Sequence, residues 1–200
     1  MTAFRELLAS LAISFDLPIL EWIRANLWCE ILDVVMPIIT MFGDGGIFWI
    51  ACAVLLFLFP KTRKIGLGMA FALTMGLIIC NMTLKPLVAR IRPYDLQAQL
   101  GVTVNLLNGA MHDFSFPSGH TIASFEAATV LLKNSRKMGI PAMVLAVLIA
   151  FSRLYLYVHY PTDVIASILL GVLFAFIGDA LAGLLTPKLR FGKRGKYEAR

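Results

Sequence analysis

Five long apolar stretches, separated by short polar or basic segments, constrain this chain more than any other feature. They cover residues 47–59, 65–84, 121–132, 140–158 and 164–185. A helix needs about 20 mostly apolar residues to cross a bilayer, and several of these stretches approach that length. Hydrophobic residues make up 59% of the 200 residues and charged residues only 15%, whereas globular chains carry about 25% charged residues. We therefore predict an all-α integral membrane protein, a helical bundle of five or six transmembrane helices.

The chain reads as a single domain over residues 1–200. Its N-terminal region, residues 1–44, mixes acids and tryptophans with apolar residues at helical spacing. This pattern favours amphipathic helices that lie along the membrane surface or dip into it. A sixth span over about residues 27–42 is the alternative. The helical core is expected over residues 45–187, and a basic cytoplasmic tail over 188–200.

Neither the cysteines nor the charges indicate a metal or a nucleic acid. Cys29, Cys52 and Cys80 lie in apolar surroundings, and an odd number is no disulfide framework. No Cys/His cluster has zinc spacing, so we expect no metal and no cofactor. The net charge of +6 is spread over short clusters between apolar runs. That pattern indicates membrane orientation. We expect no cleaved signal peptide.

Three basic clusters orient the predicted helices. They lie at residues 61–64, 133–137 and 188–200. When five spans are connected in order, all three clusters fall on one side of the membrane. The positive-inside rule makes that side cytoplasmic.

The opposite side collects polar residues from three distant segments. These residues are Lys85, Arg90, Arg92, His120, Arg153, His159 and Asp163. Cations near bilayer depth are expensive unless they are paired. The obvious carboxylates, Asp95 and Asp163, are too few to neutralise them. An anionic ligand with several oxygens would do so, and Arg and Lys both suit phosphate.

The stretch FPSGH, residues 116–120, adds helix-start chemistry beside an imidazole. If Ser118 caps a helix, the first amide groups point toward an anion, and Gly119 lets the backbone approach closely. A histidine can attack a phosphoryl group, and a second can protonate the leaving oxygen. The i, i+4 spacing of His159 and Asp163 could bring a carboxylate to an imidazole. The spacing does not decide which histidine attacks.

Three segments together resemble the signature motifs of the type 2 phosphatidic acid phosphatase (PAP2) superfamily. They are KPLVARIRP (K-x6-R-P), FPSGH (P-S-G-H) and SRLYLYVHYPTD (S-R-x5-H-x3-D), and they span residues 85–163. This superfamily includes bacterial lipid phosphatases, undecaprenyl-diphosphate phosphatases and vanadium haloperoxidases. The resemblance implies the PAP2/haloperoxidase-like helical core, and the apolar runs fit the membrane branch.

The resemblance also implies a role for each motif residue. Phosphate oxygens would be bound by Lys85, Arg92, Ser118, Gly119 and Arg153. His159 would be the nucleophile that forms a phosphohistidine, Asp163 would orient it, and His120 would be the general acid. No metal would be needed, because the three cations would take the charge-stabilising role that Mg²⁺ plays elsewhere.

The sequence indicates less specific roles for the other polar residues. For Arg90, headgroup or substrate-tail contact is expected, because Arg90 faces away from Arg92 on a helix. His112 and Asp113 are interpreted as loop surface. Glu126 lies inside a predicted span, where an ionisable side chain indicates a functional role. Alternatively, it packs against a partner such as Asn81 or a loop cation. Asp179 is expected to meet basic tail residues or water.

The predicted function is metal-independent hydrolysis of a phosphate from a membrane lipid that arrives laterally between helices. Undecaprenyl diphosphate is the favoured substrate, with phosphatidylglycerol phosphate and phosphatidic acid close behind. The predicted location is a bacterial cytoplasmic membrane, with the active site on the extracytoplasmic side. The predicted partners are the lipid phosphate and the bilayer, with no nucleic acid. A lipid transporter or scramblase with a phosphatase-like site is the alternative from another class.

Overall fold

The computed structural model describes the backbone of residues 2–194 and the side chains of residues 2–186. Within residues 2–194 the chain consists of helices and loops and contains no β-strand. The N-terminal elements are α1 (Thr2–Leu11), the π-helix η1 (Ala12–Asp16), α2 (Leu17–Leu27), α3 (Glu30–Met41), the 3₁₀ turn η2 (Asp44–Gly46) and α4 (Ile47–Leu58). The remaining elements are α5 (Arg63–Met75), the π-helix η3 (Gly76–Leu84), α6 (Lys85–Val88), α7 (Pro93–Gln99), α8 (Gly119–Asn134), α9 (Arg136–Tyr155) and α10 (Pro161–Arg194).

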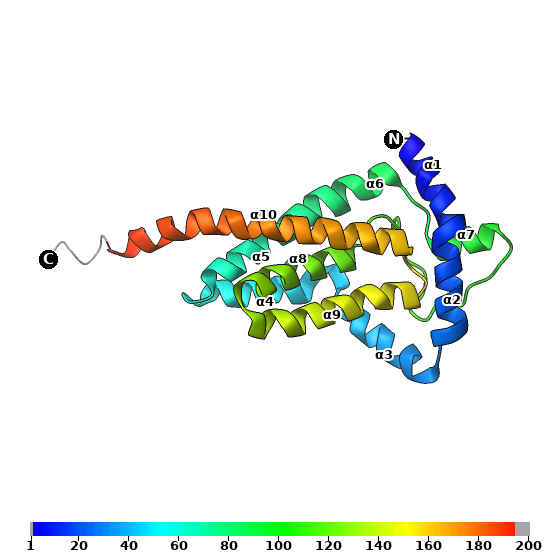
Figure 1. Cartoon of the computed structure of the whole chain (residues 1–200), viewed down its shortest axis with the longest axis horizontal. Helices are drawn as coiled ribbons and strands as arrows, with labels where there is room; N and C mark the ends of the chain where they lie inside the picture. The colour runs from blue at the N-terminus through cyan, green and yellow to red at the C-terminus, as the bar shows by residue number, and fades with distance from the viewer. Residues whose placement is uncertain (1, 195–200) are drawn as a thin grey trace.

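The core is an elongated bundle of α4, α5, α8, α9 and α10 (Figure 1). Helix α8 packs against the other four, and from Thr121 to Leu131 every residue except Ala123 is buried. Small residues let the helices approach closely, as is common in membrane bundles. At the crossing of α5 and α10, a Cβ added to Gly178 would lie only 2.6 Å from the carbonyl oxygen of Gly68.

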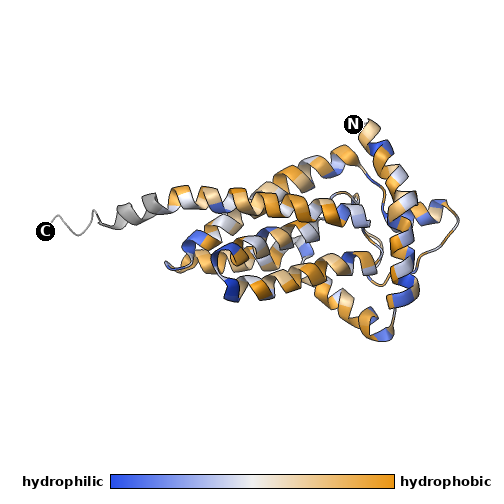
Figure 2. Cartoon of the chain, in the orientation of Figure 1, coloured by the Kyte–Doolittle hydropathy of each residue, from blue (hydrophilic) through white to orange (hydrophobic). Residues whose placement is uncertain are grey.

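Four segments within residues 2–194 are long and apolar enough to cross a membrane. They are Glu30–Leu58, Arg63–Gln99, Arg136–Tyr155 and Pro161–Thr186. Hydrophobic residues cover the sides of the bundle (Figure 2), and these large apolar side chains are exposed because lipid is their solvent. The predicted all-α membrane bundle is therefore confirmed. The suggested extra span at residues 27–42 corresponds to α3, which joins α4 through the turn η2 within the candidate segment Glu30–Leu58.

The helix formed by α1, η1 and α2 lies across one end of the bundle, beside the end of α9 and the start of α10 (Figure 1). Leu8, Ala12 and Leu20 on its inner face are buried, whereas Ile13 and Trp22 are exposed. This amphipathic pattern suits a helix with one face on protein and the other on the membrane surface, and a membrane-surface location stays a prediction.

Two of the basic clusters meet at the other end of the bundle. Asp179 in α10 pairs with Lys64 at 3.3 Å and with Lys133 at 2.9 Å. Asn134 also donates a hydrogen bond to Asp179. The expected partners of Asp179 were basic tail residues or water; the partners found among the described residues are Lys64, Lys133 and Asn134. The tail itself, residues 188–200, lies outside the part of the chain whose side chains are described.

Candidate functional site

Three cations converge at the bundle end that the N-terminal helix covers, and each is placed by the end of a helix. Lys85 begins α6 where the π-helix η3 ends, Arg92 precedes Pro93 at the start of α7, and Arg153 lies in the last turn of α9. Ala89 ends α6 in the left-handed conformation, with φ of 50°, and turns the chain toward Arg92. The side chain of Arg92 is 2% exposed and that of Lys85 is 13% exposed. The charges of all three cations act on His159, which agrees with the predicted arrangement.

A carboxylate from the loop between α7 and α8, here called the outer loop, bridges two of these cations. Asp113 Oδ2 accepts from Lys85 Nζ at 2.5 Å, and Asp113 Oδ1 accepts from Arg92 Nη2 at 2.5 Å. Burial alone would raise the pKa of Asp113, but the hydrogen bonds and charges of Lys85 and Arg92 lower it to about 2. The interpretation of Asp113 as loop surface was therefore incomplete. Asp95, one of the carboxylates considered obvious, is exposed on α7.

Arg153 is a buried cation without a carboxylate partner among the described residues. It is 1% exposed. Its Nη1 donates to Thr40 Oγ1 at 2.6 Å, its Nη2 to Met111 Sδ at 3.2 Å, and its Nε has no partner in the described part of the chain. A thioether is a weak acceptor, so Arg153 retains capacity to bind an anion.

His159 follows α9 and is held between Arg92 and Asp163. Arg92 Nη1 points toward His159 Nε2 at 3.4 Å, and His159 Nδ1 lies 3.6 Å from Asp163 Oδ2. Because arginine only donates, Nε2 faces it with its lone pair and Nδ1 carries the proton. Burial, together with the charges of Arg92 and Arg153, holds the pKa of His159 well below its usual value. The imidazole is therefore neutral near pH 7, with Nε2 available as a nucleophile.

Asp163 is fixed at the start of α10. Its Oδ2 accepts from Ser115 Oγ at 2.5 Å and from the backbone N–H of Tyr160 at 3.1 Å. Tyr160 is the N-cap residue of α10 and Asp163 is its third helical residue, so the second contact forms one half of a capping box. His159 precedes the helix, so a helix-start loop brings the i, i+4 pair together, in place of the expected turn of helix.

His120 has a carboxylate partner that sequence reasoning missed. Its Nε2 lies 2.7 Å from Asp44 Oδ1 in the turn η2. Glycines surround Asp44 in this turn, and Gly45 and Gly46 have φ of 57° and 67°. No local sequence pattern indicated Asp44 as the partner of His120, because 76 positions separate the two residues.

Ser118 and Gly119 begin α8 as expected, but Ser118 does not cap it. The Ser118 side chain accepts no hydrogen bond from a backbone N–H of α8. Its Oγ accepts from the side chain of Thr121, and its backbone N–H donates to Ser167 Oγ at 2.9 Å. Ser118 is thus occupied by internal contacts. Gly119 accommodates Asn81, since an added Cβ would lie 2.9 Å from Asn81 Oδ1.

Arg90 is turned into the protein and pairs with two carboxylates, which differs from the expected headgroup or substrate-tail contact. It is 8% exposed. Its Nη1 donates to Asp163 Oδ1 at 2.5 Å, and its Nη2 donates to Asp16 Oδ2 at 2.7 Å. The kinked end of α6 turns Arg90 inward, which ideal helical spacing does not predict.

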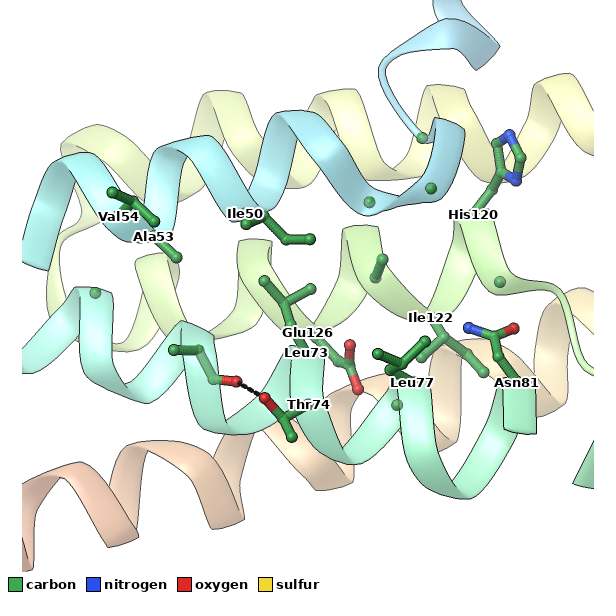
Figure 3. A pocket seen from close by; sticks show the side chains of 18 of the residues that line it. Ile50, Ala53, Val54, Leu73, Thr74, Leu77, Asn81, His120, Ile122 and Glu126 are labelled. Carbon is green, nitrogen blue, oxygen red and sulfur yellow. Dashed lines mark hydrogen bonds between the residues drawn. The ribbon is translucent and has the colours of Figure 1, made fainter. Parts of the chain in front are cut away.

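A cavity of about 800 Å³ extends from the site into the bundle between α4, α5 and α8. Lys85, Asp113 and His120 are among its lining residues. Figure 3 shows His120 at one end and apolar residues such as Ile50 and Leu73 farther along. Glu126 projects from α8 into this space (Figure 3).

Glu126 is unusual for its depth in the bundle. It is 1% exposed, and its Oε1 has no hydrogen-bond partner among the described residues. Its carboxyl group lies against Gly76. Within the described part of the chain, no hydrogen bond or ion pair joins Glu126 to Asn81 or to a loop cation, and Asn81 lies against Gly119.

Known proteins match this chain in sequence. A family model described as the PAP2 superfamily matches residues 64–180. The undecaprenyl-diphosphatase of Sulfolobus acidocaldarius is 33% identical over 169 residues, which cover 82% of this chain and 77% of that protein. The undecaprenyl-diphosphatase BcrC of Bacillus subtilis is 30% identical over 158 residues, 79% of each chain.

Solved structures match the fold as well. The crystal structure of Aquifex aeolicus LpxE has a TM-score of 0.72 at 27% identity, covering 83% of this chain and 95% of that one. A transmembrane PAP2-type phosphatidylglycerolphosphate phosphatase from Bacillus subtilis has a TM-score of 0.68 at 25% identity, covering 92% and 94%.

Replacing Asp113 should strengthen anion binding. We expect Asp113→Asn to bind inorganic phosphate about 3- to 10-fold more tightly, because the anion no longer competes with a carboxylate for Lys85 and Arg92. The gain should persist from about pH 5 to pH 8, since a group with a pKa near 2 stays ionised over that range. Isothermal titration calorimetry measures it, with the exposed Asp95→Asn as control. Unchanged or weaker binding by Asp113→Asn would contradict the competition.

Proposed function

The chain belongs to the PAP2 superfamily and is a phosphoric ester hydrolase, and on this premise we propose that it dephosphorylates a membrane lipid through a phosphohistidine at His159. One observation carries the proposal. The neutral His159, with Nε2 free of a proton, lies beside Arg92 at 3.4 Å, in a cluster whose third cation, Arg153, lacks a carboxylate partner among the described residues. Such a cluster holds a phosphoryl group within reach of a nucleophile.

In the first half-reaction, Lys85, Arg92 and Arg153 bind the phosphate oxygens, and Lys85 and Arg92 release Asp113. The lone pair of His159 Nε2 forms a bond to phosphorus as the bond to the leaving oxygen breaks. Asp163 stabilises the positive imidazole through Nδ1–H. Burial and the charge of Arg153 lower the pKa of His120 to about 3, whereas the Asp44 carboxylate opposes this shift. The negative charge of a bound phosphate also favours the protonated form, and protonated His120 gives its proton to the leaving oxygen.

In the second half-reaction, water attacks the phosphohistidine. The neutral His120 accepts a proton from this water, the P–N bond breaks, and His159 returns to its neutral state. Gly119 contributes an amide at the first turn of α8, where helix N–H groups lack intrahelical partners. Ser118 acts indirectly, by holding this turn through its internal hydrogen bonds.

The same cations support hydrolysis without a metal ion. In metal-dependent phosphoryl transfer, Mg²⁺ offsets the charge on the equatorial oxygens. Lys85, Arg92 and Arg153 supply three positive charges from three different helix ends, so this charge is offset by the protein.

The cavity between α4, α5 and α8 suits the hydrocarbon chain next to the phosphate. It begins at His120 and continues along apolar walls (Figure 3), which allows a lipid to keep its chain in the bilayer. Undecaprenyl diphosphate is the favoured substrate, because the relatives from Sulfolobus acidocaldarius and Bacillus subtilis are named for it. Phosphatidylglycerol phosphate, the lipid for which one structural neighbour is named, follows closely, as does phosphatidic acid.

The transporter or scramblase alternative is not proposed. It required the loss of a catalytic group, yet His120, His159 and Asp163 are all present, and His159 meets Asp163.

The proposed location is a bacterial cytoplasmic membrane, with the site on its outer face. The clusters around Lys64 and Lys133 meet at the end of the bundle opposite to the site, and positively charged loops favour the cytoplasm.

Phosphate release by the purified protein tests the reaction. We expect activity on undecaprenyl diphosphate that persists in EDTA and is inhibited by vanadate. His159→Ala should lose at least about 10³-fold in kcat, because the nucleophile is gone. Rapid quenching of wild type with labelled substrate should yield an acid-labile phosphohistidine. Metal-dependent turnover, or an active His159→Ala, would overturn the mechanism.

Narrowing the cavity should select against long lipid chains. Leu73→Trp is expected to lower kcat/KM for undecaprenyl diphosphate by roughly 10-fold or more, because the bulky ring occupies the chain path. A prenyl diphosphate of one or two isoprene units should be hydrolysed as by wild type. Leu169→Trp, at a position of α10 that is 66% exposed, is the matched control. Equal losses on both substrates would place the chain elsewhere.

Cysteine labelling tests the orientation. In a variant whose Cys29, Cys52 and Cys80 are replaced by Ser, Thr103→Cys should react with a membrane-impermeant maleimide on intact cells. Lys137→Cys, at the opposite end of the bundle, should react only after permeabilisation. Labelling of both from one side, or the reverse pattern, would refute the proposed topology.

A further inference from the structure

The N-terminal helix contributes an acidic residue to the network behind the proposed nucleophile. Asp16 is fully buried, although it lies on a helix whose other face is exposed. Its Oδ2 accepts from Arg90 Nη2 at 2.7 Å, and the other terminal nitrogen of the same guanidinium donates to Asp163 Oδ1 at 2.5 Å. One arginine thus joins the N-terminal helix to the carboxylate that faces His159.

Asp16 also binds the first turn of α10 directly. Its Oδ1 accepts from the backbone N–H of Thr162 at 2.9 Å, and its Oδ2 accepts from Thr162 Oγ1 at 2.7 Å. Thr162 immediately precedes Asp163, so Asp16 holds the catalytic turn both through the backbone and through Arg90.

The π-helix η1 explains why Asp16 points inward. Residues four apart on an α-helix drift by about 40° around its axis, because a turn takes 3.6 residues. The wider i→i+5 turn of a π-helix reduces this drift. Across η1, Ala12 and Asp16 therefore share the buried face that Leu8 begins and Leu20 continues. Such π-segments are frequent at functional sites.

Arg90 is locked by its surroundings. Its guanidinium lies 3.8 Å from the ring centroid of Tyr160, and its Nη2 also donates to the carbonyl oxygen of Leu8 at 3.0 Å. A planar guanidinium can serve such a set of acceptors at fixed angles, whereas a lysine ammonium cannot.

The charges of this network add to one negative charge. Two buried carboxylates, Asp16 and Asp163, share the single cation Arg90. If Asp16 were neutral, the whole charge of Arg90 would act on Asp163. Asp163 would then stabilise a positive His159 less well. With Asp16 ionised, one net negative charge remains to stabilise the imidazolium that forms during phosphoryl transfer.

We propose that Asp16, on the N-terminal amphipathic helix, is a positioning residue that acts through Arg90 to set the orientation and effective charge of Asp163. This inference rests on the proposed function, because it takes His159 as the nucleophile. It makes the N-terminal helix part of the catalytic apparatus in addition to its predicted contact with the membrane surface.

Steady-state kinetics of full-length Asp16→Asn in detergent micelles test the inference. We expect kcat to fall roughly 10- to 100-fold, with KM within about 3-fold of wild type, because the phosphate and chain contacts are untouched. The rate of phosphohistidine formation in a single turnover should fall equally. Glu6→Gln removes the same charge from an exposed position of the same helix and should retain the wild-type kcat.

Arg90→Lys is the second variant, in case Asp16→Asn does not fold. It keeps the positive charge but cannot hold both carboxylates, so a comparable fall in kcat is expected. A monodisperse, thermally stable Asp16→Asn or Arg90→Lys protein with wild-type kcat would overturn the positioning role. A fall in kcat for Glu6→Gln equal to that of Asp16→Asn would also overturn it, in favour of membrane attachment. If wild type forms no phosphohistidine, the proposed function fails first.

Discussion

The burial of positive charge at one end of a membrane bundle is the constraint on which this structure depends. Arg92 and Arg153 are almost completely buried, and a buried ion is strongly destabilising unless other groups compensate it. A loop carboxylate compensates Arg92, whereas a hydroxyl and a thioether are the side-chain partners of Arg153 among the described residues. The helix ends, the outer loop and the turn before α4 are all arranged around these charges. This end of the bundle is therefore less stable than one with fully paired charges, and its cations can bind an anion.

A second layer of ion pairs supports the first. Arg90 and Asp16 do not face the cavity, but they fix the turn from which Asp163 reaches His159. The two π-helices contribute in similar ways. One, η1, turns Asp16 inward, and the other, η3, precedes Lys85 and carries Asn81 against Gly119. The reacting groups are therefore held by contacts between distant segments rather than by any single rigid helix.

The sequence predicted the helices and the motif residues well because both leave local patterns. The apolar runs at 47–59 and 65–84 correspond to α4 and to α5 with η3, since a membrane helix is defined by composition over one continuous segment. The convergence of Arg92, Arg153 and His159 followed from the order of the spans.

The partners of these residues could not be predicted in the same way. Asp44, Asp113 and Asp16 are single acids in polar or amphipathic segments, and nothing local distinguishes them from surface residues. The expectation for Arg90 was wrong because it assumed a continuous helix through Arg92, whereas Ala89 breaks it. Pairings across 70 residues or more, such as Asp44 with His120, depend on tertiary packing.

The bridge that Asp113 forms between Lys85 and Arg92 has a consequence for the end of the catalytic cycle. Three cations around a dianion would hold inorganic phosphate strongly, and slow departure of product limits many enzymes. A tethered carboxylate is present at a high effective concentration, so it can retake Lys85 and Arg92 as soon as the product loosens. The carboxylate of Asp113 thus displaces the product, so the site binds inorganic phosphate less tightly and releases it faster.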